Sequence, residues 1–416
     1  MTEQALSLPK PLSLRRYIYL STLLGVFSEI LVVHAGVTIF LFDVVMLWNL
    51  VLIWAFLGPI VVPKWLGWFL LYLTASGAIG ILRGTDTTFL AAKQLFVIGL
   101  GSIYFANFFR LQDNQIDGAW ETYAKLAYWL TLIGIAKWLA VCLFAHRFER
   151  LQGLTTEPAA YCAVTLPAYY WYAHKWFTSR RHRKEVLWLT LGIALSASST
   201  GFLGVAFGLL LAFGKRRLIA LPFALVLICG FGVGLYTISP YVRVRARDTF
   251  GAVLNSDVAG TNISTYALIS NMFVTERVLE VHPILGNGLG SHILSNHKYI
   301  SDVPGVELVE AAGWDTGANV QDAASLALRS LSELGLMGFL GILWFIVHFW
   351  VGGKSDRAAI SCAVMLVFFE KLLRGGGYGN PEEFFFILVY MHNYWQFKQG
   401  GSEISASIPN TLTYAD

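Results

Sequence analysis

Charged residues are scarce in this sequence. Only 13% of its 416 residues are Asp, Glu, Lys or Arg, whereas a soluble protein carries about 25%. Hydrophobic residues make up 56%, and the mean hydropathy is +0.58. This composition excludes an ordinary soluble enzyme and indicates an integral membrane protein. The net charge of +4 does not require a nucleic-acid partner, because basic residues in short loops also set membrane topology.

Cysteine is rare too, and the sequence lacks internal repeats and low-complexity tracts. The four cysteines lie in apolar runs without Cys-x-x-Cys spacing, which is typical of buried apolar thiols. A cleavable signal peptide is also missing, because the apolar run after Arg16 is too long and has no small-residue cleavage site. We therefore expect the first apolar segment to remain as an anchor.

Apolar segments of membrane-spanning length recur along the chain. A helix needs about 20 apolar residues to cross a bilayer, and twelve segments meet or approach this length. They lie near residues 17–36, 38–58, 65–82, 88–109, 123–144, 158–176, 186–198, 201–213, 218–238, 328–350, 358–373 and 383–397. The pattern predicts an all-α polytopic membrane protein with about 12 transmembrane helices in a single membrane domain, 1–416.

Basic residues predict the orientation of these segments. With a cytoplasmic N-terminus, the inside loops carry about three times as many Lys and Arg residues as the short outside loops. Both termini are then cytoplasmic, and the long polar stretch 239–325 is an external loop. The tail, 398–416, is polar, and we expect it to be disordered.

Some charged residues inside the predicted spans are informative. They are Glu29, Asp43, Lys93 and Lys137, and the predicted topology places them all in the outer halves of their helices. Charges at membrane depth are costly and usually face a cavity or a partner. They indicate acid–lysine pairs, a polar cavity that opens outward, or both.

Four stretches resemble motifs of the O-antigen ligase and Wzy polymerase superfamily. They are HPILGNGLGSH (282–292), similar to an HPLLGxGLG signature; SELGLMGFLG (332–341), similar to an ExGxxG turn; RFERLQGLTTEPAAYCA (147–163), similar to an R-x-x-G-x-x-x-EP segment; and LSASSTGFLGVAFGLLLAF (195–213), similar to an LTxSRGG hairpin. The resemblance implies a GT-C-like helical fold in the bacterial inner membrane. It also implies transfer of a glycan from undecaprenyl pyrophosphate to a sugar hydroxyl, without metal or cofactor.

Three departures from the family pattern favour a polymerase over a lipid A-core ligase. Ligases carry a histidine shortly before the ExGxxG turn, where this chain has Ala324. They carry an arginine before the HP pair, where this chain has Leu268, and the hairpin arginine is missing from SASST. Wzy-type polymerases have more variable catalytic residues.

Transfer from a pyrophosphate needs cations that hold the leaving group. Arginine suits this task, because its planar guanidinium binds phosphate oxygens in pairs and stays charged. Our candidates are Arg147, Arg150, Arg277 and Arg329. Two have plain structural alternatives: Arg277, on a predicted amphipathic helix 265–281, can pair with neighbouring glutamates, and Arg329 can extend to lipid headgroups.

The reaction also needs a base that takes the proton of the acceptor hydroxyl. The candidates are Glu157, Asp322 and His282. Glu157 can instead complement a helix dipole, Asp322 can cap the helix that follows it, and His282 can be a structural residue of a turn. His292 and His297 lack acidic partners at ligand spacing, so we expect no metal site.

The glycines of GNGLG (286–290) follow no predicted strand, which excludes a dinucleotide-binding fingerprint and favours a tight turn. That turn would let the amphipathic helix pack back against the bundle.

Three functions stay open at this point. The first is polymerisation of undecaprenyl-pyrophosphate-linked repeat units, with membrane lipids as surroundings and a flippase and a chain-length regulator as possible partners. The second is ligation of a glycan to a lipid or protein acceptor. The third is secondary transport, which many spans and intramembrane charges also fit, although no inverted repeat is visible.

Overall fold

A computed structural model describes residues 13–29, 31–34, 38–145, 149–213, 237, 243–244, 247, 251 and 262–406. The N-terminal part comprises α1 (Leu14–Gly25), β1 (Leu31–His34), β2 (Thr38–Phe40), α2 (Leu41–Leu52) with a π-helical turn η1 (Ile53–Leu57), α3 (Lys64–Leu82), α4 (Thr88–Leu111) and α5 (Asp117–Ala145). Then follow α6 (Pro158–Ser179), α7 (Arg183–Ser196), α8 (Ser199–Phe213), α11 (Ile263–Val281), α12 (His292–Tyr299), the 3-10 turn η2 (Ile300–Asp302), α13 (Val306–Ala311), α14 (Leu326–His348), α15 (Asp356–Leu373) and α16 (Pro381–Ala406).

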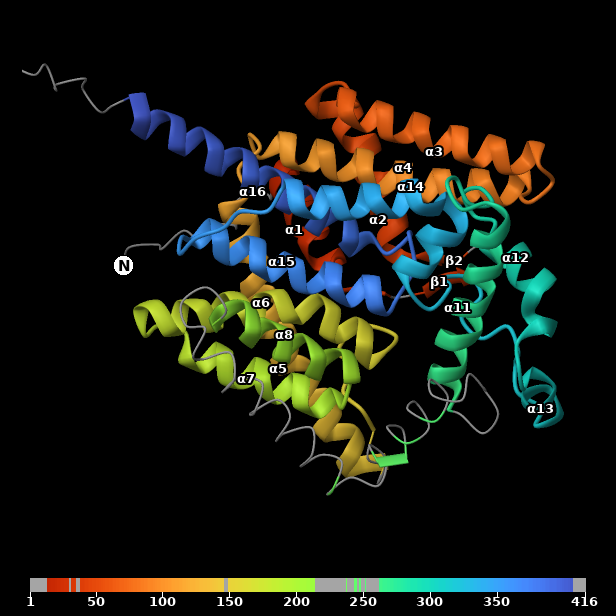
Figure 1. Cartoon of the computed structure of the whole chain (residues 1–416). Coiled ribbons are helices and arrows are strands. Elements are labelled where there is room, and N and C mark those ends of the chain that lie inside the picture. Colours follow the sequence, from red (N-terminus) through yellow and green to blue (C-terminus); the bar gives the residue numbers. More distant parts are fainter. Residues whose placement is uncertain are drawn as a thin grey trace, which may run out of the picture.

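The helices form a bundle in which α15 and α16 are central. Figure 1 shows α3 and α4 on one side of this pair and α5 to α8 on the other. Accordingly, α15 packs against α6, α8, α14 and α16, and α16 packs against α4. The helices α11, α12 and α13 lie together at one end of the bundle, near the antiparallel pair β1–β2 (Figure 1).

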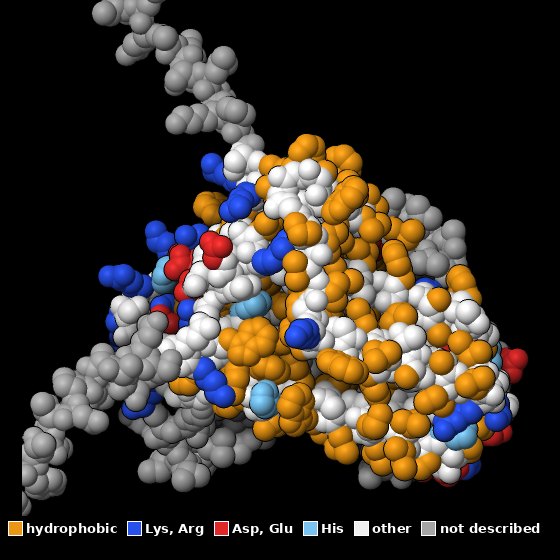
Figure 2. Space-filling view, turned by 90° about the horizontal axis from the view of Figure 1, so that it is seen from above, with side chains coloured by type: hydrophobic (Ala, Val, Ile, Leu, Met, Phe, Trp, Pro, Cys, Tyr) orange, Lys and Arg blue, Asp and Glu red, His pale blue; other side chains and the backbone are white. Residues whose placement is uncertain are grey.

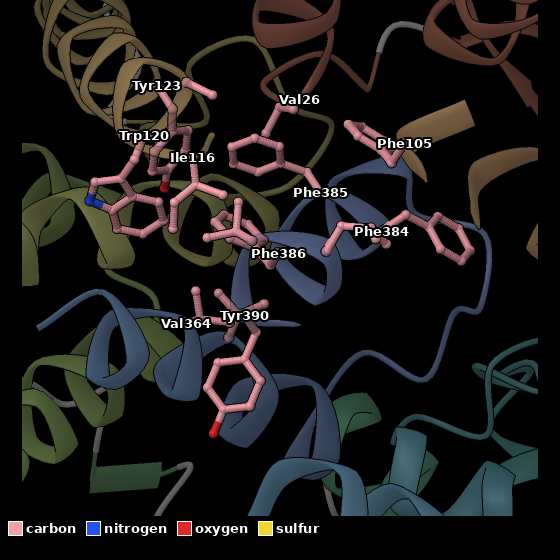
Figure 3. Packing of buried hydrophobic residues seen from close by; sticks show 14 of the residues in the cluster. Val26, Phe105, Ile116, Trp120, Tyr123, Val364, Phe384, Phe385, Phe386 and Tyr390 are labelled. Carbon is pink, nitrogen blue, oxygen red and sulfur yellow. The ribbon is translucent and has the colours of Figure 1, made fainter. Parts of the chain in front are cut away.

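An aromatic core joins the first helices to α16. Phe385 packs against Tyr123 of α5, with ring centroids 5.4 Å apart, and against Phe105 of α4, at 6.0 Å (Figure 3). All three rings are completely buried. Such pairs stabilise a fold by about 0.5–1.5 kcal/mol beyond their buried area, so they fix α16 and the loop before it.

Among the described residues, four helices are long and apolar enough to cross a membrane: α3, α4, α5 over Asp117–Phe144, and α14. Their outer faces carry large apolar side chains, for example Trp68, which is 72% exposed, and Phe89, which is 62% exposed. Figure 2 shows hydrophobic side chains over much of one face, with most charged side chains toward its two ends. Exposed apolar surface of this extent marks contact with lipid or with another protein, as expected for a helical membrane protein.

The structure corrects two boundaries predicted from the sequence. The first predicted span, 17–36, is wrong beyond Gly25, because residues 31–34 form β1 and pair with β2. This segment is rich in β-branched residues, which favour strands. The predicted disordered tail is wrong at its start, because α16 continues to Ala406; extending an existing helix costs little compared with starting one.

Other predicted elements agree with the structure. The amphipathic helix predicted at 265–281 is confirmed as α11, and the short segments 186–198 and 201–213 are α7 and α8. The predicted span 218–238 and the first part of the predicted external loop, 239–261, lie outside the described ranges apart from isolated residues.

Candidate functional site

A polar cavity of about 530 Å³ lies where α2, α4, α12 and α14 meet two loops. It is lined by Phe40, Asp43, Lys93, Gln94, Val97, Ile293, Asp315, Gly317, Asn319, Val320, Gln321, Asp322, Arg329, Gly377, Tyr378, Gly379 and Asn380. Asp322 and Arg329 were predicted as site residues, and Asp43 and Lys93 are two of the charges predicted to face a cavity. The cavity therefore gathers both kinds of group that the predicted chemistry requires.

The first loop, residues 315–324, forms one wall of this cavity. Two short turns shape it, in which Val320 N–H donates to Gly317 O and Asp322 N–H donates to Asn319 O. From α11, the Tyr266 hydroxyl donates to Thr316 O at 2.7 Å. The loop is thus bonded both within itself and to α11.

The same loop contains backbone that L-residues rarely adopt. Asn319, Ala323 and Ala324 have positive φ values of 58°, 54° and 57°. Each such residue costs of the order of 1–3 kcal/mol and persists only where the surroundings enforce its conformation. Backbone strain of this kind concentrates at functional sites, and here it adjoins Asp322.

The second loop, residues 374–380 (RGGGYGN), closes the cavity from the other side. Gly375 N–H donates to Ala324 O at 3.1 Å, and the Ser325 hydroxyl donates to Leu372 O at 2.6 Å. A Cβ atom at Gly376 would overlap the carbonyl oxygen of Asp322. The glycines thus let the two loops touch through their backbones.

Arg329 is the buried cation of the cavity, with 3% of its surface exposed. Its Nε donates to Glu333 Oε1 at 3.0 Å, its Nη1 donates to Gly376 O at 3.0 Å, and its Cζ lies 4.1 Å from the centre of the Tyr378 ring. Nη2 donates to no residue that the structure describes. One edge of a firmly held guanidinium is therefore left for a ligand.

A buried ion-pair cluster holds the second loop at its two ends. Lys371 Nζ lies 3.2 Å from Glu382 Oε1 and 2.9 Å from Glu383 Oε1. Lys371 lies in the last turn of α15, and the two glutamates lie in the first turn of α16. The cluster therefore joins the two helices that flank the RGGGYGN loop. Removing one partner of a buried pair leaves an uncompensated charge and costs about 3–5 kcal/mol.

Two of the three carboxylates that line the cavity, Asp43 and Asp322, use one oxygen each for local structure. Asp43 Oδ2 accepts from Phe40 N–H at 2.9 Å at the start of α2, and Asp322 Oδ1 accepts from Ala324 N–H at 3.0 Å. Asp322 does not cap α14, because Ser325 is the N-cap residue and accepts from Leu328 N–H. The second oxygen of each carboxylate can accept a proton or hydrogen bond from a ligand.

Two of the family-like stretches meet next to the cavity. Asn287 N–H and Gly288 N–H donate to Ser332 O and Glu333 O, both at 2.9 Å. At Gly335 the helix α14 is kinked, with φ 66° and ψ −165°, and a Cβ atom there would overlap Ile284 O. The predicted tight turn in GNGLG is confirmed, and it packs α11 and α12 against α14.

Two titratable groups lie around this junction without lining the cavity. His292 is fully buried, with Nδ1 2.7 Å from Ser332 Oγ and Nε2 2.8 Å from Asn271 Oδ1. Burial, followed by the charge of Arg329, lowers the pKa of His292 to about 3. Burial raises the pKa of Asp86, between α3 and α4, to about 7. His292 is therefore neutral. It connects α12, to which it belongs, with α11 and α14 through hydrogen bonds, and it does not act as a base.

The remaining predicted site residues lie elsewhere. Arg150 donates through Nε to Ser196 O and through Nη2 to Ala197 O, both at 3.0 Å, at the C-terminal end of α7. Arg277 is paired with Glu280 at 2.9 Å on the exposed face of α11. These bonds match ordinary helix-end and helix-surface roles.

Two further predicted residues, Glu157 and His282, do not line the cavity either, and a third lies outside the described residues. Glu157 is exposed and is the N-cap residue of α6 without a side-chain capping bond. His282 is the C-cap residue that follows α11, and burial together with the charges of Arg83 and Lys298 lowers its pKa. Arg147 lies outside the described residues.

Sequence reasoning missed the RGGGYGN loop and Lys371. The signal was a run of four glycines within six residues, after a lysine and before two glutamates. Such a run between two apolar helices indicates backbone that must approach another segment closely.

No protein-family model, curated protein or solved structure matches this chain. Within the described ranges, no group of three or more His, Cys, Asp or Glu side chains is placed to hold a metal ion.

Proposed function

We propose that this chain is a membrane glycosyltransferase of the Wzy type. It polymerises oligosaccharide repeat units linked to undecaprenyl pyrophosphate, on the periplasmic side of the bacterial inner membrane. The observation that carries the proposal is the shared cavity of Arg329, Lys93, Asp322 and Asp43. The sequence predicts two of these residues, Arg329 as a phosphate-binding cation and Asp322 as a base.

The position of the cavity suits a lipid-linked pyrophosphate. Asp43 and Arg329 lie in the first turns of α2 and α14, and Lys93 lies in the second turn of α4. The cavity thus adjoins the N-terminal ends of apolar helices, where the helix dipole favours an anion. A substrate whose tail lies in lipid would bring its phosphates to this level.

The proposed reaction joins an acceptor hydroxyl to the anomeric carbon of the donor glycan. The acceptor oxygen forms a bond to that carbon, the bond between the carbon and the pyrophosphate oxygen breaks, and undecaprenyl pyrophosphate leaves. Arg329, through Nη2, and Lys93 hold the developing negative charge. Asp322 or Asp43 takes the hydroxyl proton through its second oxygen.

The experiment is chain extension by purified protein in vesicles supplied with lipid-linked repeat units. We expect Asp322→Asn to lower the extension rate about 100-fold, because general-base catalysis contributes about 10²–10⁴-fold. Arg329→Lys keeps the charge but not the planar guanidinium, and it should weaken donor use. The matched control is Asp302→Asn, an exposed aspartate of the same polar segment. Extension at the wild-type rate by Asp322→Asn and Arg329→Lys would contradict the proposal.

The proposal includes about 12 spans, two cytoplasmic termini and an external loop over 239–325. Four apolar helices support its coarse part, a membrane-embedded protein. In this arrangement a flippase would supply the lipid-linked units, and a chain-length regulator would act on the product. A ligase is the alternative within the class, and glycan attached to a lipid or protein acceptor, with polymer length unchanged, would identify it.

A secondary transporter is the candidate from another class. The buried cluster of Lys371 with Glu382 and Glu383 favours it, since intramembrane ionisable groups often form ion or proton pathways. Uptake of substrate into vesicles that contain only this protein would support transport over polymerisation.

A further inference from the structure

Four carboxamide side chains line the cavity beside its charged groups: Gln94, Asn319, Gln321 and Asn380. They come from α4, from the 315–324 loop and from the RGGGYGN loop, so three separate segments contribute them. None of these four amide groups forms a hydrogen bond with any residue in the described ranges. Their donors and acceptors are therefore available to whatever enters the cavity.

Carboxamides recognise a particular chemistry. Each offers two N–H donors and one oxygen acceptor without net charge. This set matches sugar hydroxyls and acetamido groups, which both donate and accept. A phosphate offers only acceptors and is better served by Arg329 and Lys93. The amide-rich wall therefore has a different task from the cationic part.

The charges of the same wall narrow the choice of sugar. Asp315 and Asp322 belong to the loop that carries Asn319 and Gln321. Asp315 Oδ1 accepts from Gly317 N–H at 2.9 Å, so this carboxylate is fixed in place. These two carboxylates would repel the carboxylate of an acidic sugar. Binding sites commonly use such like-charge repulsion to exclude the wrong ligand.

The Asn319–Gln321 wall is also preorganised. Asn319 has a positive φ of 58°, which suits Asn and Gly better than other residues. The adjoining carbonyl of Ala318 accepts from the Asn271 amide of α11 at 3.2 Å. A wall fixed in this way loses little entropy when a sugar binds.

We propose that this amide wall is a saccharide subsite for an uncharged sugar that bears hydroxyl or acetamido groups, and that it rejects uronic acids. The proposal rests on the proposed function, since it names the class of sugar that the polymerase accepts next to its transfer site.

The test measures binding of free monosaccharides to the full-length protein in detergent by saturation-transfer NMR. The probes are N-acetylglucosamine, galactose and glucuronate. We expect at least one neutral sugar to bind and glucuronate to bind at least about tenfold more weakly, because a like-charge contact is costly. Gln321→Leu should weaken the neutral sugar about fivefold, as expected for the loss of one hydrogen bond.

Asn319→Gly is a second variant that keeps the backbone conformation and removes the amide. Gln115→Leu is the matched control, because Gln115 is exposed and does not line the cavity. Equal binding of glucuronate and the neutral sugars, binding of none of them, or the same loss in Gln115→Leu as in the wall variants would overturn the subsite.

Its failure is separable from failure of the polymerase. Wild-type chain extension that depends on Asp322, without selective sugar binding, removes the subsite and leaves the transferase. Selective sugar binding without any chain extension supports the subsite and removes the transferase.

Discussion

Arg329 shows how a single residue can join structure and chemistry. Its guanidinium is buried, paired with Glu333, bonded to the backbone of Gly376 and stacked on Tyr378. A buried arginine held by three neighbours is a precise binding group, since little entropy remains to be lost. Its position at the start of a predicted span was visible in the sequence, but its contact with a loop 47 residues later was not.

Asp86 gives a prediction about pH. Its Oδ2 is buried and has no hydrogen-bond partner among the described residues, while Oδ1 accepts from Thr87 N–H at 2.7 Å. Burial raises its pKa to about 7, against about 3.9 in an unfolded chain. The folded protein therefore binds more protons than the unfolded one between these values. Asp86 lowers stability progressively as pH rises from about 4 to about 7, and above that range the loss of stability stays constant.

Asp86→Asn removes this ionisation. We expect it to raise the Tm of the detergent-solubilised protein at pH 8, and to have little effect at pH 4, where aspartate is neutral in the folded state. Asp302→Asn, at an exposed site, serves as the control at both values. A Tm at pH 8 no higher than that of the wild type would show that the carboxylate is compensated in the folded protein.

Residues differ in how far the sequence alone could place them. Asp43 and Lys93 could be predicted to face a cavity, because a charge within an apolar run needs a partner or water. Arg150 could not be assigned in this way. Its bonds to Ser196 O and Ala197 O depend on how the segment between α5 and α6 approaches the end of α7, and this is a property of the tertiary fold.

At the scale of elements, hydrophobic length predicted most helices and failed where composition and length disagreed. Residues 31–34 belong to the apolar run 17–36 that predicted a span, yet they pair with residues 38–40 as strands. The sequence between α8 and α11 offered no comparable check, because its predicted span lies outside the described residues. Loop contacts were out of reach for a different reason: glycine permits close approach but does not specify the partner.

The contact between the two cavity loops leads to a prediction at this scale. Gly376→Ala should destabilise the protein by about 1–3 kcal/mol, a typical cost of overpacking, because the new Cβ atom would overlap the backbone carbonyl of Asp322. The neighbouring Gly377→Ala is the matched control, since its Cβ atom would meet only the movable side chain of Asn380 at 3.0 Å. Thermal unfolding in detergent measures both. Equal Tm values for the two variants would mean that the loops do not meet as described.

Across the whole molecule, the four family-like stretches come together in pairs. HPILGNGLGSH is bonded to SELGLMGFLG through the backbone of Asn287 and Gly288. The segment around Arg150 is bonded to the α7–α8 turn, with Leu151 N–H donating to Leu195 O. Segments about 50 residues apart thus share contacts, so their common order along the chain corresponds to two tertiary junctions.

The last prediction concerns the orientation of the molecule in the membrane. Ser301, in the polar segment before α14, and Lys354, between α14 and α15, are both exposed. If α14 crosses the membrane, these positions lie on opposite sides, because it separates them and is long and apolar enough to span. In a cysteine-free background, we expect Ser301→Cys to react with a membrane-impermeant maleimide applied from outside the inner membrane. Lys354→Cys should react only after that membrane is permeabilised, as the basic character of its loop predicts.

Labelling of both cysteines before permeabilisation would exclude a transmembrane α14. The reverse pattern would place the cavity on the cytoplasmic side and contradict a periplasmic polymerase.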